Sequence, residues 1–113
     1  MTHAILPWPP KELSPNARVH WARKATVVKY YKEACIFWLR KSEPFTGWAR
    51  KRDFVVTFHA PDNRRRDRDN IISAFKSGQD ALSFVTGVDD NKFNVKYIFA
   101  SPVQGGAVRV EAI

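Results

Sequence analysis

Residues 61–70 read Pro61-Asp62-Asn63-Arg64-Arg65-Arg66-Asp67-Arg68-Asp69-Asn70, a charged loop between two apolar patterns of different period. The residues before it, from Asp53 to Ala60, alternate apolar and polar side chains, which predicts a strand. After it, apolar residues recur at helical spacing from Asn70 to about Thr86. We therefore expect a strand, a loop and a helix, with Asp69 or Asn70 capping the helix start and Gly87 ending it.

The remaining sequence predicts the other elements around this unit. We expect a loop from Lys11 to Arg23 and a connection from Ser42 to Lys51. The apolar stripe of residues 25–41 predicts an amphipathic helix that includes Cys35 as a small buried side chain. Further strands are expected at Thr2–Leu6, Lys92–Ala100 and Ala107–Ile113. The order predicts an α+β fold: one domain over residues 1–113, with two helices on a mixed or mostly antiparallel sheet of about four strands.

The composition indicates a polyanionic partner. Lys and Arg number 19 against 11 acids, which gives a net charge of +8. Because the basic residues are spread along the chain instead of forming one basic amphipathic helix, nucleic acid is favoured over a membrane surface. No signal-peptide pattern opens the chain and no apolar run approaches a membrane span of ~20 residues, so we expect a cytoplasmic protein. One cysteine excludes a zinc finger, so any metal would be bound mainly through oxygen.

The aspartates of the central stretch are candidate metal ligands. Asp67 and Asp69 are two residues apart, so on an extended chain their carboxylates would face the same side and repel unless a cation lies between them. Asp90, after the predicted helix, would join them only if the following strand runs back. Alternatively, Asp69 is only a helix cap, Asp67 pairs with Arg66 or Arg68, and Asp89-Asp90 is a polar turn.

Basic residues near these acids are candidate DNA contacts. Phosphate contacts are expected from Arg64, Arg65, Arg66 and Arg68, and in the first loop from Asn16, Arg18 and Lys24. His20 would approach the same phosphates, with Trp21 stacking or bracing the loop. The alternative is that Trp8 and Trp21 pack at the edge of the core and the charges are merely solvated.

Several motifs in order resemble the RusA family of Holliday junction resolvases of bacteria and their phages. The chain opens with Leu6-Pro7-Trp8-Pro9-Pro10 and Ser14-Pro15-Asn16-Ala17-Arg18-Val19-His20-Trp21. It continues with Asp67-x-Asp69-Asn70, with Lys76 and Asp80 on the following helix, and with Gly87-Val88-Asp89-Asp90. The chain differs from the family pattern by about three extra residues between Asn70 and Lys76, which is a little less than one helical turn.

The resemblance implies an endodeoxyribonuclease that uses Mg²⁺, with Mn²⁺ as a substitute, held by Asp67, Asp69 and Asp90. Lys76 would orient water or stabilise charge, or else would form an ordinary contact with Asp80. The resemblance also implies a bacterial or phage-encoded homodimer that nicks two opposed strands of a four-way DNA junction in recombination and repair. Two alternatives stay open: a metal nuclease for other branched DNA, and a basic DNA-binding module without catalysis.

Overall fold

The computed structural model describes residues 2–44 and 47–113 and contains one four-stranded mixed sheet. The strands are β1 (His3–Leu6), β2 (Asp53–His59), β3 (Asn94–Ala100) and β4 (Ala107–Ala112), in the order β1-β4-β2-β3. β4 pairs antiparallel with both β1 and β2, whereas β2 and β3 are parallel. The predicted α+β fold with a mixed sheet is confirmed.

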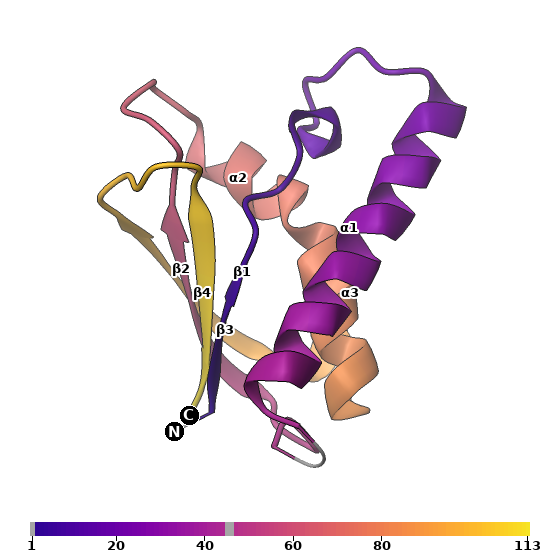
Figure 1. Cartoon of the computed structure of the whole chain (residues 1–113), viewed down its shortest axis with the longest axis vertical. Helices are drawn as coiled ribbons and strands as arrows, with labels where there is room; N and C mark the ends of the chain where they lie inside the picture. The colour runs from indigo at the N-terminus through magenta and orange to yellow at the C-terminus, as the bar shows by residue number, and fades with distance from the viewer. Residues whose placement is uncertain (1, 45–46) are drawn as a thin grey trace.

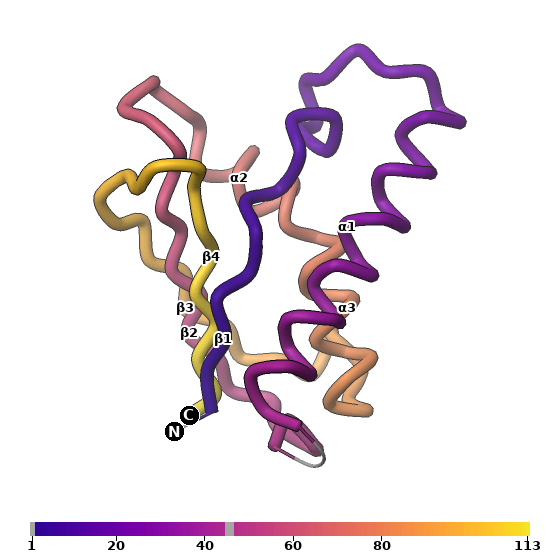
Figure 2. The backbone as a smooth tube through the Cα atoms, viewed as in Figure 1, coloured from indigo at the N-terminus to yellow at the C-terminus, as the bar shows by residue number. Residues whose placement is uncertain are grey.

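The helices lie together on one side of this sheet (Figure 1). They are α1 (Trp21–Ser42), α2 (Arg68–Ala74) and α3 (Lys76–Thr86), with short 3₁₀ turns η1 (Lys11–Leu13) and η2 (Asp90–Lys92). Since parallel strands need a crossover, α2 and α3 carry the chain from the end of β2 back to the start of β3 (Figure 2). None of the helices in the described ranges is long and apolar enough to cross a membrane.

The core forms between the sheet and the helices where the sequence periods predict it. Phe54, Val56 and Phe58 alternate with less buried residues along β2 and are almost fully buried. The residues of α1 that face them are also buried, Cys35 among them with no exposed surface, as expected. Burial raises the pKa of the Cys35 thiol to about 12, so this residue is an inert packing side chain.

The first helix begins earlier than its apolar stripe. We expected a loop to Arg23 and a helix from Ala25, but α1 begins at Trp21, because Nδ1 of His20 accepts a hydrogen bond from the backbone N–H of Ala22 at 3.2 Å. That side-chain acceptor satisfies one of the free N–H groups of the first turn. Residues 45 and 46 of the expected Ser42–Lys51 connection lie outside the described residues.

The second predicted helix is divided into α2 and α3 at Phe75. Phe75 has φ −86° and ψ 3°, is fully buried and packs its ring edge against Phe58, with the centroids 5.6 Å apart. The start also differs, because Asp67 caps α2 in place of Asp69 or Asn70. Gly87 ends α3 in the left-handed conformation with φ 72°, as predicted.

Candidate functional site

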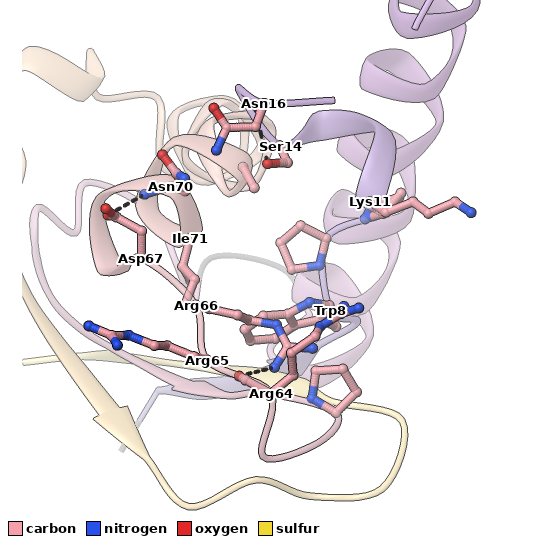
Figure 3. Close-up of a pocket in the computed structure, with 14 residues that line it drawn as sticks. Trp8, Lys11, Ser14, Asn16, Arg64, Arg65, Arg66, Asp67, Asn70 and Ile71 are labelled. Carbon is pink, nitrogen blue, oxygen red and sulfur yellow. Dashed lines mark hydrogen bonds between the residues drawn. The ribbon is translucent and has the colours of Figure 1, made fainter. Parts of the chain in front are cut away.

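Two segments far apart in the sequence meet at a pocket of about 520 Å³ beside the N-terminal end of α2. One wall is made by the loop that follows β1 and the other by the charged segment between β2 and α2 (Figure 3). The polar and charged residues that line it are Lys11, Ser14, Asn16, Arg64, Arg65, Arg66, Asp67 and Asn70. Three of these, Lys11, Ser14 and Asn70, were not predicted from the sequence to bind a ligand.

Trp8 connects the pocket to the core. Its ring and that of Phe58 pack edge to face, with centroids 6.2 Å apart, and the guanidinium carbon of Arg66 lies 5.9 Å from the Trp8 ring centroid. Gly106, with φ 73°, approaches so closely that a Cβ there would lie 2.8 Å from Cβ of Trp8. Trp8 therefore packs at the edge of the core, as the alternative interpretation held, and also supports the basic loop.

Arg66 is held within its own loop. Its Nη1 donates to the backbone carbonyls of Asp62 and Arg64 and forms an ion pair with Oδ1 of Asp62 at 2.9 Å. The hydrogen bond from Arg66 is the main reason that the pKa of Asp62 is lowered. Only 16% of the Arg66 side chain is exposed, so its role in this structure is to shape the loop.

The neighbouring arginines differ from Arg66 in their surroundings. Arg64 and Arg65 are exposed and line the pocket, so their guanidinium groups are accessible to an anion. Arg68 instead places its guanidinium 4.9 Å from the ring centroid of Phe99. Of the four predicted phosphate contacts in this segment, Arg64 and Arg65 are the best placed.

The predicted contacts of the first loop are separated by the structure. Asn16 is exposed and lines the same pocket as the arginines. Arg18 lines a neighbouring hollow that also includes Lys11 and Asn16. Lys24 lies in the first turn of α1, outside the lining of both hollows. His20 caps α1, and Trp21 is 77% exposed, so Trp21 does not pack at the edge of the core as the alternative held. The phosphate contact of His20 and the stacking of Trp21 stay predictions.

Asp67 is the acid that reaches the pocket. Its Oδ1 accepts hydrogen bonds from the backbone N–H groups of Asp69 at 2.8 Å and Asn70 at 3.4 Å, which fixes the carboxylate at the N-terminus of α2. Asp69 follows in the first turn of the same helix and is exposed. A helix N-terminus stabilises negative charge, so both carboxylates are favourably placed.

Asp90 belongs to a different cluster. Nζ of Lys76 lies 2.5 Å from Oδ2 of Asp90 and 3.3 Å from Oδ1 of Asp80, so the contact with Asp80 that was the alternative role for Lys76 is present. The hydrogen bond from Lys76 is the main cause that lowers the pKa of Asp90, and the same bond raises the pKa of Lys76. Lys76 thus joins the start of α3 to η2.

The parallel pairing of β2 and β3 explains this separation. The residue partners run from Asp53 with Asn94 to His59 with Ala100, so the two strands start at the same end of the sheet. Asp67 follows the C-terminal end of β2, whereas Asp90 precedes the N-terminal end of β3. In residues 2–44 and 47–113, no three His, Cys, Asp or Glu side chains form a group that could hold a metal ion.

The donor chemistry of Asp67 and Asp69 nevertheless fits magnesium. Mg²⁺ is usually held by one or two carboxylates together with waters and substrate phosphates, not by a complete cage of protein ligands. Asp67 lines the basic pocket, and Asp69 lies two residues further on in the first turn of α2, so this chain offers carboxylates of the kind that Mg²⁺ prefers. In this structure the Asp90 carboxylate forms an ion pair with Lys76 instead of facing Asp67 and Asp69. A role for Asp90 as the third metal ligand stays a prediction.

Comparison with known proteins gives a relative but no activity. No protein-family model matches the chain. The chain is similar to an uncharacterized protein of Xylella fastidiosa (strain Temecula1), with 37% identity over 99 residues. The alignment covers 82% of this chain and 63% of that protein, so the chain spans less than two thirds of its relative's length.

Proposed function

We propose that the protein is a magnesium-dependent, structure-selective endonuclease of the RusA type that resolves four-way DNA junctions. The observation that carries the proposal is the pocket beside α2. The two segments on which the resemblance rests, residues 6–21 and 61–70, both contribute to its lining. If the two motifs matched the family only by chance, their side chains would not be expected to line the same pocket. That they do supports the resemblance.

The charges of the pocket support binding of a phosphodiester. Lys11, Arg64 and Arg65 supply positive charge, and the amide of Asn16 supplies a hydrogen-bond donor. Asp67 is an acid at the same surface and would weaken the binding of a polyanion on its own. The negative charge of Asp67 would favour binding instead if Asp67 and Asp69 hold Mg²⁺, or Mn²⁺ in its place. The bound ion would activate a water and neutralise charge on the phosphate oxygens.

The roles of the protein's own residues follow from their contacts. The hydrogen bonds from Asp69 N and Asn70 N orient the Asp67 carboxylate. Arg64 and Arg65 would hold the phosphate backbone, and Lys76 would keep Asp90 charged and oriented. One chain has room for one such centre, so paired nicks in opposed strands need a homodimer with two-fold symmetry.

The test is metal-dependent cutting of a mobile four-way junction, a replication-fork analogue and a linear duplex by the purified protein, each with and without Mg²⁺. Asp67→Asn and Asp69→Asn remove one charge each. Asparagine at residue 67 keeps the acceptor that caps α2, so the fold should be preserved. We expect paired symmetric nicks in the junction and a loss of about 100-fold or more in rate in each variant, the scale of losing a group that stabilises the transition state.

Asp89→Asn is the matched control, because Asp89 also caps a helical turn through its carboxylate, at the start of η2. It should cut like the unmodified protein. Equal cutting of all three DNAs would mean that the protein is a nuclease without a preference for four-way junctions. Binding without cutting in Mg²⁺ and in Mn²⁺ would show a DNA-binding module instead of an enzyme.

A further inference from the structure

The outward face of α1 carries exposed aromatic rings that the fold does not use. Tyr30 is 68% exposed, Phe37 56% and Trp38 40%. Other residues of α1 make its contact with the core, namely Val27, Tyr31, Cys35 and Leu39, which are buried. Large apolar side chains gathered on a surface usually mark a site of interaction. We call Tyr30, Phe37 and Trp38 the α1 aromatic face.

Tyr30 and Phe37 form a row along the helix, and Trp38 adjoins Phe37. Tyr30 and Phe37 are seven residues apart, which is about two helical turns or ~10 Å, so they share one side of α1. Phe37 and Trp38 contact each other edge to face, with centroids 5.2 Å apart. Lys41, one turn further, places its Nζ 5.7 Å from the Phe37 ring and 5.5 Å from the Trp38 ring. The row therefore ends in a cation.

The charge of α1 indicates what the aromatic face binds. Glu33 is the single acid of this helix, whereas its basic residues are Arg23, Lys24, Lys29, Lys32, Arg40 and Lys41. Such a helix is complementary to a polyanion. A second copy packed on this face through its own α1 would bring the same cations of the two helices together and be repelled there.

We propose that the α1 aromatic face binds unpaired nucleotides of DNA, with bases stacking on Tyr30 and Phe37 and phosphates meeting the lysines and arginines of α1. Aromatic rings between cations are the usual platform for single strands, because every base has a stacking surface. This proposal goes beyond the proposed function and rests on it only in assuming that the partner is DNA. It is a second contact surface, since no residue of α1 lines the pocket beside α2.

Binding of labelled oligothymidine of about 15 nucleotides, followed by fluorescence anisotropy, tests this site. Tyr30→Ala and Phe37→Ala should each weaken binding about five-fold or more, the loss expected when one ring–base stack is removed. The dependence of affinity on salt should stay the same in both, since neither change removes a charge. Lys41→Gln should instead make the negative slope of log affinity against log salt shallower by about 0.7.

Val103→Ala is the control, because Val103 is 40% exposed but lies in the turn between β3 and β4. It should bind like the unmodified protein. Alanine is the best helix former, so both α1 variants should fold, as thermal unfolding can check. Unchanged binding in Tyr30→Ala and Phe37→Ala would overturn the proposal. A shift from dimer to monomer in sedimentation, with intrinsic affinity kept, would also overturn it and assign the face to a second copy.

The same variants separate this site from the proposed nuclease. If the protein cuts no DNA yet Tyr30→Ala and Phe37→Ala lose oligothymidine, the aromatic face stands and the nuclease fails. If the junction is cut and these variants bind oligothymidine normally, the nuclease stands and the aromatic face is not a nucleotide site.

Discussion

Adjacent arginines in the central stretch have different tasks. Arg66 bonds to two backbone carbonyls and to Asp62, and it covers Trp8, whereas Arg65 is exposed at the pocket. An arginine whose donors are satisfied within the protein stabilises a loop, and one whose donors face water can bind phosphate. The three consecutive arginines are identical as sequence, so only their contacts distinguish them.

Arg66→Ala and Arg65→Ala should therefore act on different properties. Arg66→Ala should lower the free energy of unfolding by about 1–2 kcal/mol, since hydrogen bonds of a charged, mostly covered group are lost. Arg65→Ala should leave stability within about 0.5 kcal/mol but lower the salt slope of duplex binding by about 0.9. Urea unfolding and salt titration of DNA binding measure the two effects. Equal stability losses would contradict this division.

The break between α2 and α3 depends on a residue pair that local propensity does not describe. Phe75 turns into the core, and Gly78 in the first turn of α3 lies directly against its ring. A Cβ at residue 78 would collide with the Phe75 ring, which has no exposed surface and cannot move aside. The glycine is required here by packing, although glycine normally weakens a helix.

Gly78→Ala should thus destabilise the protein, against the usual preference for alanine in a helix. Helix propensity alone predicts a gain of about 1 kcal/mol. We expect a net loss of about 1–3 kcal/mol from overpacking against Phe75. Thermal and urea unfolding provide the measurement. Ser73→Ala is the matched control, because Ser73 is exposed on α2, and it should be neutral or slightly stabilising. A more stable Gly78→Ala would show that the Phe75 ring can relocate.

Across the whole molecule, the ion pair of Lys76 and Asp90 joins the crossover helices to the start of β3. The lowered pKa of Asp90 means that its contribution is complete above the ordinary value of about 4 and is lost as the pH falls through the lowered one. The raised pKa of Lys76 means that its contribution is complete below about pH 10 and is lost as the pH rises further. The pair therefore stabilises the fold between these limits.

Asp90→Asn should lower the free energy of unfolding by about 0.2–1 kcal/mol at neutral pH, the range for exposed pairs, since 61% of the Lys76 side chain is exposed. The difference from the unmodified protein should disappear in acid, once the pH has fallen through the lowered pKa of Asp90 and residue 90 is neutral in both proteins. Urea unfolding at the two pH values tests this. A difference that persists in acid would mean that Asp90 stabilises the fold by another contact.

Periodicity in the sequence predicted most of the elements because the burial of one face is a local pattern. Phe54, Val56 and Phe58 alternate in the sequence and are buried in the structure, and Gly87 ends α3 where it was expected to. Local patterns were less informative at the helix starts. His20 and Asp67 cap through side-chain hydrogen bonds that several neighbouring polar residues could also have made.

The sequence by itself therefore determined the α+β class, the buried faces of the strands and the basic character of the surface. Only the tertiary structure decided that Asn16 meets Arg64 and Asp67 at one pocket, and that Asp90 meets Lys76. The pairing of charges across long stretches of chain depends on strand direction and helix packing. The parallel alignment places the C-terminal end of β2, which Asp67 follows, and the N-terminal end of β3, which Asp90 precedes, at opposite ends of the sheet.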